Sequence, residues 1–133
     1  MSTRGSLVIT GIFGLSGVGL GALGSHALRA LFAQNGLGHV WETAVLYQLV
    51  HTLALLAVLL TMDHRNPVSS AVLIWAVGCW IAGIILFSGS LYALALGGPA
   101  FLGPVTPLGG LALMFGWVFV IVAALRSGKS PTP

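Results

Sequence analysis

Charged residues are so sparse along this chain that the gaps between them predict where it crosses a membrane. Residues 5–28, 43–62 and 66–125 contain no charged side chain and are dominated by apolar residues. A helix needs about 20 residues to cross the hydrocarbon core of a bilayer. The first two gaps each fit one crossing, and the third fits two crossings joined by a turn. The pattern therefore predicts an all-α integral membrane four-helix bundle.

Turn-forming residues set the expected helix ends. Between the apolar runs the sequence changes to glycine, proline or charged residues, which favour turns or interrupt a helix. The first apolar run is too long and too rich in glycine for a cleaved signal peptide, so we expect it to remain as a crossing. We predict a single transmembrane domain over residues 1–133, with helices at about 6–30, 40–61, 69–96 and 105–125 and a polar tail at 126–133.

Composition and charge support this reading and predict an orientation. The chain is 57% hydrophobic and 5% charged, whereas soluble domains contain about 25% charged residues. The predicted crossings place Arg29 on one side and four cations on the other, namely Arg4, Arg65, Arg126 and Lys129. Because cytoplasmic loops carry an excess of Lys and Arg, this predicts both termini on the cytoplasmic side, with the opposite orientation as the alternative.

The sequence lacks both a nucleic-acid-binding cluster and a pair of cysteines that could form a disulfide. It contains no basic cluster of the kind that binds nucleic acid, so no nucleic-acid partner is expected. Cys79 is the only cysteine, which excludes an intrachain disulfide. Its apolar neighbours favour an inert thiol.

Glycines line one face of the first predicted helix. Gly14, Gly17, Gly21 and Gly24, preceded by Gly11, follow one another at intervals of three or four residues, which keeps them on one side of a helix. Such a face lets a second helix approach closely, and Gly17 and Gly21 match the GxxxG pattern. Two interpretations follow: helix packing within this chain, or self-association of two chains.

The second predicted helix carries polar side chains within the membrane. Thr43, Tyr47 and His51 are spaced by four residues and form one stripe, with Gln48 beside it. Ionisable residues at such a depth usually face the interior of a bundle and are paired. We expect structural hydrogen bonding for His51, with ligand contact as the alternative. A haem held between His26 and His51 is disfavoured because the two lie at different depths, and no metal site is predicted.

Glu42 opens the second helix, where the positive end of the helix dipole favours a negative charge. Pairing with Arg29 or His39 would support a structural role, and a proton or ligand role is the alternative. Near the end of the third helix, Ser88 and Tyr92 share a face at the same expected membrane level. We therefore predict a polar cluster or ligand-binding site near the outer face, formed by His26, Glu42, Tyr47, Gln48, His51, Ser88, Ser90 and Tyr92.

Four segments resemble a known family in their order and spacing. They are GALGSHAL (21–28), ETAVLYQLVHTLALL (42–56), FSGSLYALAL (87–96) and TPLGGLALMFGW (106–117). They are similar to small membrane proteins like transmembrane protein 256, also called domain of unknown function 423, although Ser25 stands where alanine is more usual. The resemblance implies a four-helix integral protein of bacterial inner membranes or mitochondria-related settings. It assigns no catalytic residue, and its motif positions coincide with the predicted polar cluster.

Three functions fit these observations. The favoured one is an accessory or ligand- and lipid-binding subunit of a larger membrane complex, with a bound lipid or quinone and no other cofactor. Its partners would be the lipid bilayer, that complex or a second copy of the chain. One alternative is an oligomeric small-solute or proton transporter or channel, in which His51 and Glu42 relay protons. Another is a membrane enzyme or haem-binding protein using Tyr47, His51 and Glu42, although Glu42 and His51 lie on opposite faces of one helix.

Overall fold

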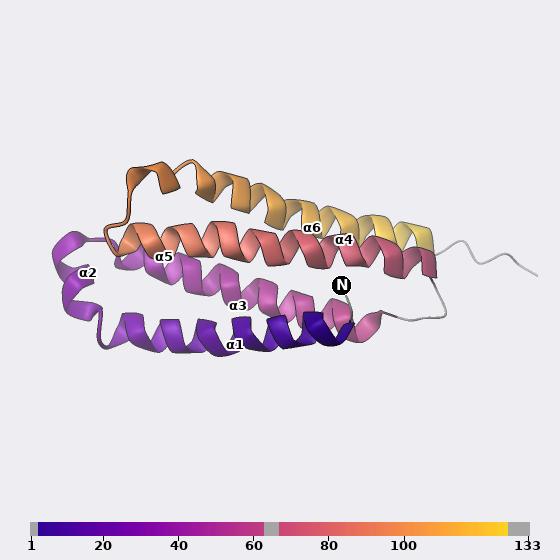
Figure 1. The fold of residues 1–133 in the computed structure, drawn as a ribbon, viewed down its shortest axis with the longest axis horizontal. Coiled ribbons are helices and arrows are strands. Elements are labelled where there is room, and N and C mark those ends of the chain that lie inside the picture. The colour runs from indigo at the N-terminus through magenta and orange to yellow at the C-terminus, as the bar shows by residue number, and fades with distance from the viewer. Residues whose placement is uncertain (1–2, 63–66, 128–133) are drawn as a thin grey trace, which may run out of the picture.

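The chain folds into long helices that run alongside one another and are joined by short connections (Figure 1). The computed structural model describes residues 3–62 and 67–127, except for the side chains of 67–69 and 127. These residues contain no strand. In chain order the elements are α1 (Thr3–Ser25), α2 (Arg29–Asn35), α3 (Gly38–Thr61), α4 (Pro67–Gly83), the π-helical turn η1 (Ile84–Ser88), α5 (Gly89–Ala95), the 3-10 helical turn η2 (Ala100–Leu102) and α6 (Val105–Ser127).

Four segments of the described chain are long and apolar enough to cross a membrane. They are Thr3–Ser25, Gly38–Thr61, Ser70–Ala95 and Ala100–Arg126. The third segment runs through α4, η1 and α5 without a break in the helix. The prediction of an all-α protein with four candidate crossings is therefore confirmed for the residues that the structure describes.

The first helix ends earlier than the apolar pattern indicates. α1 ends at Ser25, and a turn at residues 26–28 separates it from α2, whereas the sequence predicts one helix to about residue 30. In this turn the Leu28 amide donates to the carbonyl of Leu23, five residues earlier, at 3.0 Å. That bond replaces the usual helical bond to the fourth residue back, so the helix axis can change direction. α2 then ends at Asn35, and Gly36 caps it with a φ of 70°, which glycine adopts without strain.

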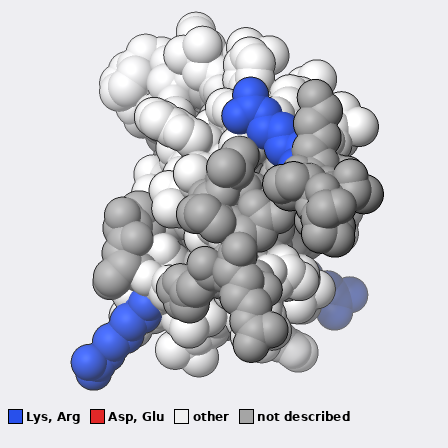
Figure 2. Space-filling model, turned by 90° about the vertical axis from the view of Figure 1, so that its right-hand side faces the viewer, with Lys and Arg blue, Asp and Glu red and all other residues white. Residues whose placement is uncertain are grey.

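Both ends of the described chain lie at the same end of the molecule (Figure 1). We call this the terminal end, and we call the opposite end, which holds α2 and η2, the α2 end. Arg4 in α1 and Arg126 in the last turn of α6 belong to the terminal end. Figure 2 views this end and shows basic side chains but no acidic one among the described residues in view. Arg65 and Lys129, which contribute to the orientation prediction, lie outside the described residues.

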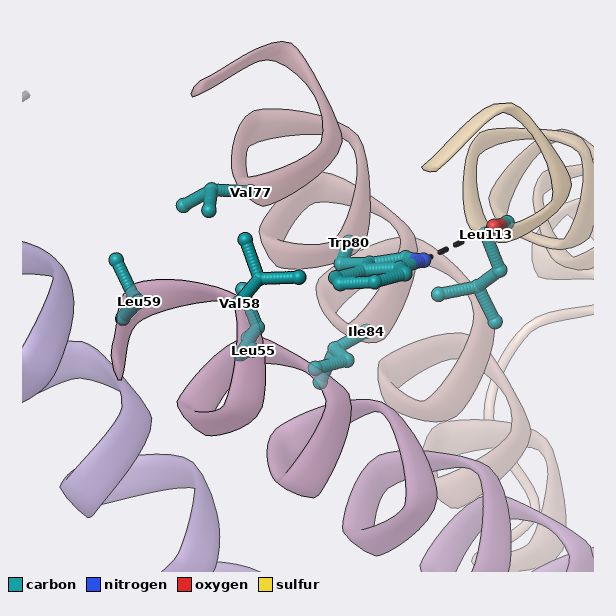
Figure 3. Close-up of a cluster of buried hydrophobic side chains, with 7 residues drawn as sticks. All are labelled: Leu55, Val58, Leu59, Val77, Trp80, Ile84 and Leu113. Atoms are coloured by element: carbon teal, nitrogen blue, oxygen red, sulfur yellow. Dashed lines mark hydrogen bonds between the residues drawn. The ribbon is translucent and has the colours of Figure 1, made fainter. Parts of the chain in front are cut away.

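The core lies where α3 meets α4 and η1. α1 packs on α3, and α6 packs along α4 and η1. Figure 3 shows the central side chains, with the Trp80 indole N–H donating to the Leu113 carbonyl at 3.2 Å. Because lipid tails are as apolar as these side chains, close packing and hydrogen bonds, more than the hydrophobic effect, hold such helices together. The buried cluster comprises Leu55, Val58, Leu59, Val77, Trp80, Ile84 and Leu113.

The glycine face of α1 is turned toward α3. A β-carbon added at Gly17 would lie 2.7 Å from Leu49 Cδ2, and one at Gly24 would lie 2.5 Å from Trp41 Nε1. Gly14 and Gly21 also meet α3, at Thr52 and Val45, whereas a β-carbon at Gly11 would meet nothing within 4 Å. The absence of side chains at these positions thus brings the two helices close within one chain.

Candidate functional site

Gln48 is buried where α1, α3 and α5 meet. Its amide nitrogen donates to the Phe13 carbonyl at 2.8 Å and to Ser16 Oγ at 2.9 Å, both on α1. Its amide oxygen accepts a hydrogen bond from the Tyr92 phenol on α5 at 2.9 Å. Both amide protons are therefore used, and one side chain joins three helices. Of the predicted cluster, Gln48 and Tyr92 are brought into direct contact.

His51 lies farther along α3, roughly 20 Å from the start of the helix at 1.5 Å per residue. Its Nδ1 lies 2.8 Å from the Tyr47 carbonyl, and the Trp117 indole N–H donates to its Nε2 at 3.2 Å. A carbonyl can only accept, so Nδ1 carries the proton and the ring is neutral in this arrangement. The ring also packs edge-on against Trp80. Both ring nitrogens are thus engaged in structural hydrogen bonds.

Tyr47 packs beside His51 but faces outward. Its ring stacks on the imidazole, with the ring centroids 5.9 Å apart, and packs against the Phe87 ring, with the centroids 4.7 Å apart. The side chain is 41% exposed on the surface of the bundle. A shallow groove of about 320 Å³ beside it is lined by Leu46, Tyr47, Val50 and His51. Tyr47 therefore belongs to the lipid-facing surface, in contrast to its buried neighbour Gln48.

Ser88 and Ser90, at the junction of η1 and α5, differ in their hydrogen bonding. Ser90 Oγ donates to the Phe87 carbonyl at 3.0 Å and lies 2.7 Å from Thr106 Oγ1 on α6. Ser88 is 1% exposed, yet its Oγ has no hydrogen-bond partner among the described residues. Buried hydroxyl groups without a partner are rare. Ser88 is thus embedded in the bundle without being linked to His51 or Tyr92.

His26 and Glu42 lie apart from these buried groups, at the α2 end. His26 is exposed in the turn after α1, and Glu42 is exposed near the start of α3. Neither side chain has a hydrogen-bond or ion-pair partner among the described residues. The pairing considered for Glu42 with Arg29 or His39 is not formed, and His39 instead lies with Nδ1 3.1 Å from the Gly36 carbonyl. The eight predicted residues are therefore distributed over several environments.

Glu42 borders a groove between α1, α2 and α3, which we call the Glu42 groove. Its volume is about 300 Å³. Apart from the Glu42 carboxylate and the Ser25 hydroxyl, its wall is apolar, aromatic or glycine. Glu42 lies only about 6 Å along α3 from the helix start, which places the carboxylate near the end of the crossing. The lining residues are Gly21, Gly24, Ser25, Phe32, Gly38, Trp41, Glu42, Val45, Leu46 and Leu49.

Several residues that take part in these contacts were not predicted from the sequence. Trp41 donates to the Leu20 carbonyl at 2.9 Å and packs edge-on against Tyr92 at 4.7 Å. Trp117, Ser16 and Thr106 supply partners for His51, Gln48 and Ser90. The sequence offers only an indirect indication of one of them. The glycine face of α1 predicts a large side chain on the helix that packs against it, and opposite Gly24 that side chain is Trp41.

Side chains that could ligate a metal ion do not gather at one point in the described part of the chain. No group of three or more His, Cys, Asp and Glu side chains lies close enough to share a metal ion in that part of the chain.

Comparison with known sequences identifies relatives across nearly the whole chain. The profile of the family described as "Protein of unknown function (DUF423)" matches residues 20–110. The chain is 38% identical to the UPF0382 membrane protein YwdK of Bacillus subtilis over 90% of its own length and 95% of the relative. It is 36% identical to the UPF0382 inner membrane protein YgdD of Escherichia coli K12 over 95% of its own length and 93% of the relative. The chain belongs to the DUF423 family.

Membership in the DUF423 family confirms the resemblance seen in the sequence. With its four apolar crossings, the chain is a multi-pass membrane protein. The relative from Escherichia coli is named an inner membrane protein, which supports the predicted location in the bacterial inner membrane. No solved structure matches the chain at a significant level.

Proposed function

We propose that this DUF423 protein binds a membrane lipid in the Glu42 groove. The lipid would place an ammonium headgroup at the Glu42 carboxylate and the first part of its tail along the apolar wall. The observation that carries the proposal is the Glu42 carboxylate, which has no partner among the described residues and borders a groove whose wall, apart from Ser25, is apolar, aromatic or glycine. The protein would thus act as a lipid-binding module of the inner membrane, on its own or as a subunit of a larger assembly.

The size and depth of the groove suit one headgroup and its adjoining chain. Ligand pockets start at about 300 Å³, and the Glu42 groove has about 300 Å³. Glu42 stands near the start of α3, where headgroups meet the hydrocarbon, and Trp41 and Phe32 offer aromatic surfaces at the same end. The remainder of a lipid tail would continue into the surrounding bilayer.

The charge of Glu42 favours an ammonium over a quinone. A carboxylate has only acceptors to offer, and a quinone ring likewise presents carbonyl acceptors. An ammonium supplies both N–H donors and the opposite charge, and hydrogen bonds to charged groups are the stronger ones. An aminophospholipid such as phosphatidylethanolamine therefore matches the groove better than an oxidised quinone does.

The hydrogen bonding of His51 supports a binding role over proton relay. Its Nδ1 proton is held by the Tyr47 carbonyl, and its Nε2 is occupied by the Trp117 N–H. To accept a second proton, the ring must first lose the bond from Trp117, because Nε2 would become a donor.

The proposal includes the orientation in which both termini lie in the cytoplasm. It is supported by Arg4 and Arg126 at the terminal end and by the cytoplasmic excess of basic residues in membrane proteins. The Glu42 groove would then face the outer leaflet. Labelling of cysteines introduced after the C-terminal residue, in intact cells and in inverted vesicles, would test this: access from outside in intact cells contradicts it.

Native mass spectrometry of protein released from nanodiscs tests the lipid assignment. The nanodiscs would contain equal amounts of phosphatidylethanolamine and phosphatidylcholine, since choline is also cationic but has no N–H donor, and a trace of ubiquinone. We expect retention of phosphatidylethanolamine, reduced about tenfold in Glu42→Gln, which corresponds to about 1.4 kcal/mol. Asp63→Asn, the change of the only other acidic residue in the sequence, serves as the control and should retain it.

Other results would contradict parts of the proposal. Equal retention of the two phospholipids, or unchanged retention in Glu42→Gln, would rule out recognition by the carboxylate. Selective retention of ubiquinone would assign the groove to a quinone instead. A protein that emerges free of every lipid would overturn the binding role itself.

A further inference from the structure

A second groove lies at the terminal end, between the start of α1, the end of α3 and the middle of α4. It has a volume of about 230 Å³. α1 packs on α3, and only 11% of its membrane window is buried inside the protein. Most of α1 is therefore exposed on the side of the bundle, and this groove lies where its first turns meet α3 and α4. The groove is lined by Thr3, Ser6, Leu59, Met62, Ile74, Trp75, Val77 and Gly78.

The chemistry around this groove differs from that of the Glu42 groove. No acidic side chain lines it among the described residues. Arg4 follows Thr3 directly on the first turn of α1 and is exposed. Trp75, on the groove wall, is 67% exposed, and its indole N–H has no acceptor among the described residues. The groove thus has a basic residue next to Thr3 in the chain, and its wall is apolar apart from Thr3, Ser6 and the Trp75 N–H.

We propose that this groove binds an anionic phospholipid such as phosphatidylglycerol. Its phosphate would interact with Arg4 and with the Trp75 N–H, and one acyl chain would fill the gap between α1 and α4. Anionic lipids are attracted to basic residues near the membrane surface, and tryptophan favours the same level because its ring is apolar and its N–H is polar. The charges separate the two grooves: the groove at the terminal end would favour a headgroup with a net negative charge, and the Glu42 groove would favour the ammonium group of a zwitterionic headgroup.

Gly78 provides a direct test of the groove. A β-carbon at this position would meet nothing within 4 Å, so Gly78→Leu fills the groove without a clash at the backbone. Gly89→Leu is the matched control, because Gly89 is equally open, lies on the same continuous crossing and does not line the groove. In phosphatidylcholine nanodiscs containing phosphatidylglycerol, we expect Gly78→Leu to lower retention of phosphatidylglycerol about tenfold and Gly89→Leu to leave it unchanged.

Substitution of Arg4 tests whether the anionic headgroup is recognised. Each basic residue near a membrane surface contributes about a fivefold preference for anionic lipid, so Arg4→Gln should lower retention of phosphatidylglycerol by about that factor. Arg29→Gln, a matched change in α2 at the opposite end, should not. An equal loss in both variants would show a general surface attraction and overturn the site.

The wild-type protein gives an independent readout that does not depend on variants folding. A photoactivatable phosphatidylglycerol analogue, with its reactive group on the acyl chain, should crosslink to the peptide containing Ile74–Gly78 of α4. Crosslinking elsewhere, or equal competition by phosphatidylcholine, would contradict the proposal. Glu42→Gln should leave this crosslink unchanged, so the binding proposals for the two grooves can be tested independently.

Discussion

The two outer helices of this protein, α1 and α6, are attached in different ways. On α1, Gly17 and Gly21 face the aliphatic side chains of Leu49 and Val45 of α3, and Gly24 faces the Trp41 ring. On the other side, a β-carbon at Gly109 of α6 would collide with the backbone of Phe87, and one at Gly116 would collide with the Trp80 ring. Both interfaces therefore place a buried tryptophan against a glycine, and the backbone contact at Gly109 distinguishes the α6 interface.

This contrast accompanies a difference in where the grooves occur. The Glu42 groove and the groove at the terminal end both include residues of α1, the shallow groove beside Tyr47 is lined by α3 alone, and none of the three includes a residue of α6. The two grooves proposed to bind lipid thus lie beside α1, away from the backbone contact of α6. The following variants measure how the packing of the two helices differs.

The largest effect is expected at the α6 interface. Gly109→Ala would place its new methyl group against the Phe87 backbone, which cannot move without displacing η1. We expect a loss of about 3 kcal/mol in the free energy of unfolding, at the upper end for overpacked cores. Gly110→Ala is the control, because its methyl would lie 3.6 Å from the Phe87 ring, an ordinary contact. Unfolding by SDS titration in mixed micelles measures both, and equal stability of the two variants would refute a rigid interface.

Gln48 should give the next largest effect, because it joins α1 to the rest of the bundle. Gln48→Leu removes the bonds to Phe13, Ser16 and Tyr92. Interhelical hydrogen bonds in membranes average about 0.6 kcal/mol each, so we expect a loss of about 2 kcal/mol in the same titration. Tyr92→Phe removes one of the three bonds and should cost about a third as much. A Tyr92→Phe variant as unstable as Gln48→Leu would show that the phenol, not the amide, holds the junction.

A smaller effect is expected on the glycine face of α1. A methyl at Gly17 would lie 2.7 Å from Leu49 Cδ2, the end of a flexible side chain, whereas a methyl at Gly19 would meet nothing within 4 Å. Both changes gain the same helix propensity, so their difference isolates the packing. We expect Gly17→Ala to be about 1 kcal/mol less stable than Gly19→Ala, at the low end for overpacking. A difference as large as that between Gly109→Ala and Gly110→Ala would abolish the contrast between the two interfaces.

The smallest effect, with the opposite sign, is expected at Ser88. Its Oγ is buried without a partner among the described residues, so Ser88→Ala removes an unpaired hydroxyl at little cost in packing. Stability should stay unchanged or rise by about 0.5 kcal/mol. Ser90→Ala, which loses its bond to Phe87 and its contact with Thr106, should be destabilised instead. Marked destabilisation by Ser88→Ala would mean that the hydroxyl has a partner, such as a buried water molecule.

The sequence predicts the crossings well because uncharged length alone decides whether a helix can span a bilayer. It also locates the close-packing face of α1, since glycine spacing is a local property. The break at residues 26–28 could not be predicted, because no glycine or proline occupies it and the apolar run continues through it. After the turn, α2 packs beside α3 and the Asn35 side chain donates to the Ala95 carbonyl, contacts that the local sequence does not reveal.

Partners at the candidate site depend on tertiary structure in the same way. The depth of His51 in its crossing indicates a buried, bonded imidazole, but nothing local identifies Trp117, which is 66 residues away, as its donor. Glu42 and His26 look similar to the buried polar residues in the sequence, yet they lie at the surface of the α2 end. Spacing along one helix shows which side chains share a face, and it does not show which face is covered.

Because of the π turn Ile84–Ser88, the number of residues in this crossing determines which side chains of its last part face the neighbouring helices. Such a turn holds one residue more than an α-helical turn, and each residue rotates a helix by 100°. Deleting a single residue there would straighten the segment into a regular helix and swing Tyr92 away from Gln48, even though both residues were still present. Natural variants of this protein should therefore tolerate changes of side chain within the turn more readily than the loss of one position.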